Sequence, residues 1–356
     1  MTWDYFMNVA DEMNRKVQCY DNELSQLENQ LKESHGKERR EIRTCVERVK
    51  EELRRSYEQE VKDDVPRAFS TYLVDDTTVW WFGELPRKED ARTEIYMPIA
   101  QTLTINEPGK FRDGLDFRPD FSKLLSSAWL ALQVDFELLT PWYSKDDRVF
   151  HLLDNPVRKD RVFGVPFMAA SSWKGMLRWA CRMQARLQEH FEAGKRFEDW
   201  TDPDWILHLF GNERGEEEHE KLHQGALVFY PTWFDRIGFE VINPHSRERR
   251  AGTQPIYYEV VPPGAKGTFS LLYAPWPGMN PEAKPEDVLP KLLDAIEALF
   301  TTYGISAKRT VGWGTAKIEK WSAFHKTGDT VEEDEKDSRD ELWQEVQTWL
   351  SVGGTP

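Results

Sequence analysis

The strongest constraint on the fold is a repeated order of strand, helix and strand patterns between residues 128 and 321. The strand segments alternate or are rich in β-branched and aromatic residues, and the helical segments carry apolar residues at helical spacing. In chain order the segments are Ala128–Leu138, Ser172–Phe191, Ala226–Tyr230, Gly267–Tyr273, Val288–Tyr303 and Thr315–Trp321. This order predicts an α+β, ferredoxin-like domain with long insertions.

Two further strands are expected outside this series. Ile256–Val261 comes just before Gly267–Tyr273, and the turn residues Pro262–Gly264 between them predict that the two strands pair. Thr77–Phe82 has the composition of another strand.

The N-terminal part of the chain predicts an α-helical coiled-coil hairpin over residues 1–66. Apolar residues from Trp3 to Leu31 recur in alternating steps of three and four, which is a heptad seam. His35–Gly36 interrupts this seam, and a second helix is expected to end before Pro66, because proline disfavours helix in the preceding residue. The apolar stripe of the second helix consists of Ile42, Val46, Val49 and Leu53. Such a hairpin can dock on its own chain or on a partner subunit.

The C-terminal part, residues 326–356, is expected to follow the main domain of residues 67–325 as an acidic linker and a short helix. The segment Gly328–Glu341 is dense in acidic residues and is expected to be solvated. An apolar stripe suited to docking then recurs at helical spacing, at Leu342, Val346, Trp349 and Leu350.

The composition is typical of a soluble, cytoplasmic protein. Hydrophobic residues make up 39% of the 356 residues and include 15 Trp, which is enough for a substantial core. The chain shows no apolar run of about 18 residues and no charged-then-apolar leader, so no membrane partner is expected. The three cysteines, Cys19, Cys45 and Cys181, form no C-x-x-C pair, which fits a reducing compartment and disfavours a cysteine zinc site.

The net charge of −15 is unusual for a protein that would bind nucleic acid alone. Basic residues nevertheless cluster locally at Arg158–Arg161, Arg247–Arg250 and Lys308–Arg309. Local basic patches on an acidic chain favour a subunit that meets RNA inside an assembly.

The stretch from Leu153 to Arg178 contains the first candidate site. It reads as an extended loop with Asp154, followed by a helix that starts on Ser171 and Ser172. Serine hydroxyls and the free N–H groups of a helix start, together with Lys174 and Arg178, suit an anion such as an RNA phosphate. Simple helix capping beside solvated charge is the alternative.

A glycine-rich segment forms the second candidate phosphate site. Its glycines let the backbone approach a phosphate closely, and the alternative is a tight hairpin without a ligand. The residues are Gly304, Lys308, Arg309, Gly312 and Gly314. A third candidate RNA contact, which could equally be a solvated charge run, consists of His245, Arg247, Arg249 and Arg250.

Other catalytic motifs are not supported. His219–His223 matches the H-E-x-x-H pattern of zinc proteases, but the segment leaves about two helical turns at most and offers no third ligand. We therefore expect no protein metal site of this type. Neither a serine nucleophile elbow nor a GKS/GKT phosphate loop is present, and no histidine pair is well placed for metal-free RNA cleavage.

Three of these motifs together resemble the RAMP superfamily, the RNA-binding subunits of CRISPR-Cas effector complexes. They are Asp154–Val157, Ser171–Arg178 and Gly304–Gly314, in that order on the strand and helix pattern. Within the superfamily the chain is most similar to the backbone subunits of type III complexes, whose copies line the guide RNA. The chain departs from the family pattern at Phe167–Ala170, where Ile-Pro-Gly is usual, and at Thr140–Ser144, where His-x-Gly is usual.

The resemblance covers about Ala128–Trp321. It implies a ferredoxin-like, RNA-recognition-motif-like RAMP domain that acts in antiviral defence. Guide RNA, target RNA and other effector subunits are the partners it implies.

The resemblance also gives Asp154 a catalytic role. In target-cleaving subunits the corresponding aspartate lies in a loop beside the RNA and cuts it in a metal-dependent way, which implies Mg²⁺ here. His151 and Asp160 are close enough in sequence to assist. Two alternatives stay open: an aspartate before Asn-Pro is a common turn former, and the chain could be a non-catalytic RNA-binding subunit that uses its helical hairpin for protein docking.

Overall fold

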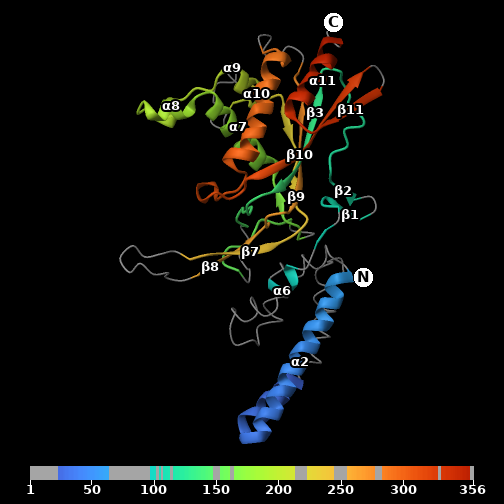
Figure 1. The fold of residues 1–356 in the computed structure, drawn as a ribbon, viewed down its shortest axis with the longest axis vertical. Coiled ribbons are helices and arrows are strands. Elements are labelled where there is room, and N and C mark those ends of the chain that lie inside the picture. The colour runs from blue at the N-terminus through green and yellow to red at the C-terminus, as the bar shows by residue number, and fades with distance from the viewer. Residues whose placement is uncertain are drawn as a thin grey trace. The chain divides into compact units, whose positions relative to one another are not determined.

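The computed structural model describes residues 23–63, 97–101, 104–105, 107–112, 115–146, 153–160, 164–212, 223–243, 255–276, 283–327 and 330–352. The chain divides into two compact units, each built from several segments (Figure 1). One unit comprises Met1–Asn106, Lys145–Pro166 and Arg236–Glu259. The other comprises Glu107–Ser144, Phe167–Asp235 and Val260–Pro356.

The second unit is a mixed helix and sheet domain around a five-stranded sheet with the order β11-β10-β3-β9-β5 (Figure 1). All neighbouring strands in this sheet are antiparallel. The strands are β3 (Leu130–Leu138), β5 (Leu227–Phe229), β9 (Lys266–Tyr273), β10 (Ala316–Thr327) and β11 (Thr330–Lys336). Strand β3 lies at the centre, and its alternating buried and half-buried residues show that one face meets the helices.

Two helices supply the core on that face, α7 (Ala170–Gln184) and α10 (Pro285–Ala298). Phe136 of β3 contacts Trp173 of α7 and Phe300, with ring centroids 6.3 and 4.7 Å apart. Phe269 of β9 joins the same aromatic group, 4.5 Å from the Trp173 ring. Helix α10 continues into a π-helical turn, η4 (Leu299–Tyr303). Aromatic residues from two strands and both helical segments therefore form one core.

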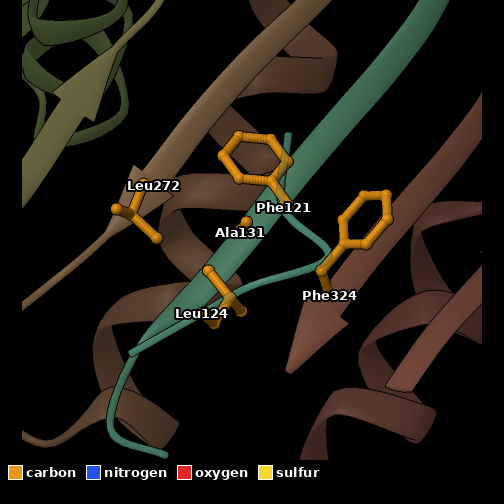
Figure 2. Close-up of a cluster of buried hydrophobic side chains, with 5 residues drawn as sticks. All are labelled: Phe121, Leu124, Ala131, Leu272 and Phe324. Carbon is orange, nitrogen blue, oxygen red and sulfur yellow. The ribbon is translucent and has the colours of Figure 1, made fainter. Parts of the chain in front are cut away.

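The opposite face of the sheet is covered at one end by the segment that precedes β3. Figure 2 shows Phe121 and Leu124 of this segment lying over Ala131, Leu272 and Phe324, which come from three neighbouring strands. Farther along the same face the cross-strand partners are polar, and Thr268 donates a hydrogen bond to Asp135 at 2.6 Å.

Several short elements connect these parts. After α7 the chain turns through Arg186, the one non-glycine residue with positive φ among those described, into α8 (Leu187–Glu192). The remaining elements of the second unit are β1 (Lys110–Arg112), β2 (Leu115–Asp116), β4 (Phe167–Met168), η2 (Phe197–Asp199), α9 (Asp204–Phe210), β6 (Thr232–Trp233) and η5 (Arg309–Val311). Strand β1 pairs with β2, and β4 pairs with β6.

The first unit contains the helices expected near the N-terminus. Residues 23–33 are helical, Gly36 has a φ of 61°, and α2 runs over Gly36–Asp63. The break at His35–Gly36 is confirmed, and Val46 and Val49 of the second stripe are buried. The described part of α2 reaches Asp63, and the predicted helix end before Pro66 lies outside the described residues. Most of the heptad seam and the strand expected at Thr77–Phe82 lie outside the described residues, so the coiled coil stays a prediction.

In the described part of the chain no helix is both long enough and apolar enough to span a bilayer.

The first unit also holds α6 (Met97–Ala100) and a two-stranded sheet of β7 (Gly238–Ile242) and β8 (Ile256–Val260). The predicted pairing of Ile256–Val261 with Gly267–Tyr273 is wrong, because β8 pairs with β7 instead. The reason is that both edges of β9 are occupied, one by β3 and the other by β5. The Pro262–Gly264 turn, in which Gly264 has a φ of 80°, therefore connects two different sheets.

The predicted solvated linker is a second correction. Residues 330–336 form β11, which pairs with β10 from Thr327–Thr330 to Trp321–Lys336, and β10 itself runs through the expected boundary at 325/326. Edge strands tolerate charge, and Lys320 of β10 bonds Glu335 of β11 at 2.7 Å. The expected short helix is present as α11 (Arg339–Val352), with Leu342, Val346 and Trp349 buried. It docks on its own chain, where Trp349 stacks on His325 of β10 at 5.6 Å.

Candidate nucleic-acid interface

The start of α7 differs in detail from the predicted serine cap. The helix begins at Ala170 with Ala169 as its N-cap, and Ala169 makes no side-chain capping bond. Ser171 and Ser172 therefore lie inside the first turn, where Ser171 is exposed and Ser172 half-buried. The capping role expected of the serines is wrong because the helix starts earlier than the polar residues indicate. The N–H of Ser172 donates to Ala169 O at 2.9 Å, whereas the N–H of Ser171 is a first-turn group that faces the helix start.

Trp173 fixes this helix start on the sheet. Its side chain is fully buried, and its indole Nε1 donates a hydrogen bond to Thr232 Oγ1 at 3.0 Å. The next residue, Lys174, is exposed. Partial burial, and then the positive charge of Arg178, lower the pKa of Lys174. A rigidly held helix thus presents one cation close to its N-terminus.

Arg178 does not accompany Lys174 at the surface. Its Nε and Nη2 donate to Asp202 Oδ2 at 2.9 and 2.6 Å, and Arg182 bonds the same carboxylate at 2.6 and 2.8 Å. Both arginines are buried, with exposures of 8% and 9%. Burial alone would raise the pKa of Asp202, but the hydrogen bonds from Arg182, Arg178 and Trp200 hold it below its usual value. The Arg178 guanidinium is therefore bound within the protein.

The glycine-rich segment follows α10 and closes on itself. Gly304, Gly312 and Gly314 all have positive φ, at 79°, 83° and 92°. A side chain at Gly304 would place its Cβ 2.8 Å from the backbone oxygen of Trp313, so this position requires glycine. Ile305 N donates to Gly314 O at 2.8 Å and brings the two ends of the loop together. The loop tip, which includes Gly312, is exposed.

Ser306 attaches this loop to the end of β3. Its buried Oγ accepts a hydrogen bond from Tyr143 N at 3.0 Å and donates one to Tyr143 O at 3.1 Å. Trp142 adds a bond from its Nε1 to Ile305 O at 2.9 Å. Sequence reasoning missed this attachment because Thr140–Ser144 and Ser306 are far apart in the chain. A tryptophan directly after a predicted strand was the available signal.

Arg309 ties the loop to α7. Its guanidinium lies 4.3 Å from the ring centroid of Trp179, whose ring meets Tyr303 edge-on at 4.9 Å. Burial lowers the pKa of Arg309, and its Nη1 is buried with no hydrogen-bond partner among the residues that the structure describes. The half-buried Lys308 lies next to it in the loop. Arg309 therefore packs the glycine-rich loop against α7 at Trp179, in the second half of the helix.

Asp154 lies in the other unit, in the segment 153–160. Leu153 before it is buried, Asp154 is exposed, and Asn155 is half-buried. The backbone of this segment bonds to β8, where Glu259 N donates to Asn155 O at 3.0 Å. The segment is thus an ordered strand-like connection that presents one carboxylate to solvent.

The same segment contains a buried ion pair that sequence reasoning missed. Lys159 Nζ contacts Glu259 Oε1, and both side chains have an exposure of 0%. A charged residue inside the apolar strand Ile256–Val261, and a lysine two positions after the buried Val157, were the signals. Both side chains are shielded from solvent, unlike the exposed carboxylate of Asp154 in the same segment.

The remaining candidates lie outside the described residues or have structural partners. His151 and the basic residues His245, Arg247, Arg249 and Arg250 lie outside them, as does most of the H-E-x-x-H segment. Its described residue, His223, is exposed, and its N–H bonds Asn212 Oδ1. Within the described ranges no group of three or more His, Cys, Asp or Glu side chains is arranged to hold a metal ion.

Comparisons with known proteins match this region of the chain. A family model described as the RAMP superfamily matches residues 135–317. No curated protein matches the sequence.

Two solved structures share part of the fold. One is titled "Cryo-EM structure of the Type III-B Cmr-beta bound to cognate target RNA", with a TM-score of 0.40, 18% identity, 56% of this chain covered and 61% of that chain covered. The other is titled "CRISPR RNA-guided surveillance complex, pre-nicking", with a TM-score of 0.40, 10% identity, and 56% and 77% of the two chains covered. This chain therefore spans less than two thirds of the first of these chains. Likenesses at these TM-scores carry no argument about function.

Proposed function

This chain belongs to the RAMP superfamily, and from that premise we propose that it is a guide-RNA-binding backbone subunit of a type III CRISPR-Cas antiviral complex. The observation that carries the proposal is the packing of the glycine-rich loop against α7 at Trp179, both inside the matched residues 135–317. The strands β3, β5, β9 and β10 with helices α7 and α10 follow the ferredoxin-like order, which supports the same assignment.

Guide binding in this proposal is a contact to the sugar-phosphate backbone. The first-turn N–H group at Ser171 and the exposed Lys174 offer a donor and positive charge at one helix end, and Ser172, whose N–H already donates to Ala169 O, would contribute its hydroxyl. Lys308 and Arg309 would supply positive charge in the loop, where Gly304, Gly312 and Gly314 form the backbone turns that let a phosphate approach. Arg178 is left out, because Asp202 already binds its guanidinium. Such contacts hold RNA of any sequence, as a guide-binding subunit requires. His245, Arg247, Arg249 and Arg250 remain a predicted further contact.

Purification with the neighbouring subunits tests this part of the proposal. We expect the chain to be isolated as part of a multi-subunit particle that contains a short RNA of defined length. A chain that stays monomeric and free of RNA when it is expressed together with its effector subunits and guide would contradict the proposal.

Target cleavage through Asp154 is the second part of the proposal. The exposed carboxylate of Asp154 stands on an ordered segment and can approach an RNA strand. The reaction needs the 2′-hydroxyl to lose its proton as its oxygen attacks phosphorus, and the 5′-oxygen to take up a proton as its bond to phosphorus breaks, which gives a 2′,3′-cyclic phosphate and a 5′-hydroxyl. Mg²⁺ fits a single exposed carboxylate, since it is commonly held by one or two carboxylates plus substrate phosphates, and would stabilise charge on the leaving oxygen. Asp154 would position the scissile phosphate, and Asp160 is a secondary candidate to assist.

Replacing Asp154 by Ala in the assembled complex tests cleavage. We expect the cut opposite this subunit to be lost, with a rate at least about 100-fold lower, while guide and target stay bound. Asp204→Ala, which removes an exposed carboxylate from α9, is the matched control and should cleave normally. Unchanged cleavage in Asp154→Ala would leave the non-catalytic alternative, an RNA-binding subunit that uses its helical hairpin for protein docking.

A further inference from the structure

Lys159 and Glu259 form a completely buried ion pair in the first unit, and stability does not explain it. Each side chain is 0% exposed. Taking two such ions out of water costs several kcal/mol each, and well-packed apolar residues in place of a buried pair are often neutral or stabilising. A buried pair is better explained by the geometry that it imposes on its surroundings.

The Glu259 carboxylate holds two parts of the segment that carries Asp154. Its Oε1 accepts from Lys159 Nζ, and its Oε2 accepts from Val157 N at 3.0 Å. The backbone of the same residue donates to Asn155 O at 3.0 Å. Asn155 Nδ2 in turn donates to Tyr257 O at 3.3 Å. Residues 155–159 are thus attached along β8, and Glu259 bonds three of them, Asn155, Val157 and Lys159.

The other side of the segment is fixed by Lys145–Asp146. Asp146 N donates to Pro156 O at 3.1 Å, and Lys159 N donates to Asp146 Oδ2 at 3.4 Å. A β-bridge also joins Lys145 to Val157. The segment therefore lies between two backbones, with Asp154 exposed immediately before its first attached residue.

We propose that Lys159 and Glu259 are positioning residues for Asp154. The carboxylate orients the Val157 amide, and the lysine neutralises and orients the carboxylate, so that the backbone before Pro156 holds Asp154 in one place. This inference rests on the proposed cleavage by Asp154 and names the residues that would align it. Misplacing a reacting group by about 1 Å can lower a rate about 100-fold.

Two double variants test whether Lys159 and Glu259 position Asp154 or only occupy space in the core. Lys159→Met/Glu259→Gln removes both charges and keeps a carbonyl oxygen that can accept from Val157 N. Lys159→Met/Glu259→Met removes both charges and that acceptor, at a similar side-chain volume. Both are assembled into the complex, and melting temperature and guide content are measured as checks of folding.

We expect the Gln variant to cleave target at nearly the wild-type rate. The Met variant should show a maximal cleavage rate lowered by about 10- to 100-fold at an unchanged KM for target. Hydrogen–deuterium exchange of the peptide covering 153–160 should accelerate in the Met variant alone. If the ion pair only fills space in the core, the exchange rate of the 153–160 peptide and the cleavage rate will be the same in both variants. That result would overturn the proposal.

The controls keep the two proposals apart. If the Met variant does not fold, Lys159→Leu/Glu259→Leu takes its place, because it also removes the acceptor for Val157 N. A folded Gln variant with fast exchange or lost cleavage rejects the proposal in either case. Asp154→Ala is assayed in parallel. If that variant cleaves normally, the proposed catalysis fails, whereas the exchange rates still report whether the pair holds the segment.

Discussion

At the scale of single residues, Asp202 decides which cations of α7 are available to a ligand. It binds Arg178 and Arg182 and also accepts from Trp200 Nε1 at 2.8 Å. Lys174, one helical turn before Arg178, has no part in this network and stays exposed. Asp202, which lies outside the helix, therefore leaves Lys174 and not Arg178 as the exposed positive charge near the start of α7.

Asp202→Asn should destabilise the second unit by about 3–5 kcal/mol, because it leaves two buried guanidiniums without a counter-charge. The pKa of Asp202 is depressed in the folded state, so its stabilisation is complete above the unfolded pKa of about 3.9 and is lost as the pH falls through the folded pKa. Urea unfolding of wild type and Asp202→Asn, from about pH 7 down to about pH 3, gives the difference between their free energies of unfolding. This difference should shrink below about pH 4, and a difference that stays constant with pH would contradict the pairing of Asp202 with the two arginines.

At the scale of elements, the C-terminal β11 and α11 complete the core of the second unit. Trp349 stacks on His325, and Leu342 and Val346 are buried beside it. The acidic residues of β11 lie on an edge strand, where charge discourages pairing with other chains. The tail is thus part of the domain and not an appendage to it.

Trp349→Ala should cost about 3–5 kcal/mol of unfolding free energy, since it removes a large buried ring. Trp343 on the same helix is half-exposed and provides the matched control. Trp343→Ala should change stability by less than about 1 kcal/mol, since substitutions away from buried features have small effects. Equal losses in the two variants by thermal or chemical unfolding would show that α11 does not pack as described.

Local patterns predicted the elements well and their partners poorly. The strand at β3, the helices α7, α10 and α11 and the break before α2 follow from spacing and from glycine or proline positions. The pairing of β8 and the role of residues 330–336 do not, because strand partners depend on which sheet edges are free. The same limit applies to the candidate site. Arg178 resembles an exposed helix cation until Asp202, distant in sequence, is placed beside it.

At the scale of the whole molecule, a net charge of −15 opposes binding of a polyanion. Any RNA contact must then come from a few local cations, such as Lys174 and Lys308, acting over distances shorter than the screening length of about 8 Å at physiological salt. The assembly of several subunits along one guide would provide the affinity that a single acidic chain lacks.

Lys174→Ala/Lys308→Ala should weaken guide binding in every sequence context. Two lost phosphate contacts should reduce the slope of log K against log salt concentration by about 1.4, from about 0.7 per contact on single strands. Lys123→Ala/Lys195→Ala removes the same charge from other exposed positions and serves as the control. Filter binding of guide RNA by the assembled subunits between about 50 and 300 mM salt gives both values. Identical slopes for the two variants would contradict the proposed contacts.

The central place of β3 has a consequence for synthesis of the protein. Its two neighbours, β9 and β10, are residues 266–273 and 316–327, so β3 leaves the ribosome long before either partner. At about 5–20 residues per second, the last of them follows roughly 10–40 s later. During that time both hydrogen-bonding edges of β3 and its apolar face are open to mispairing. The nascent chain therefore depends on protection of this one strand until β10 has been synthesised.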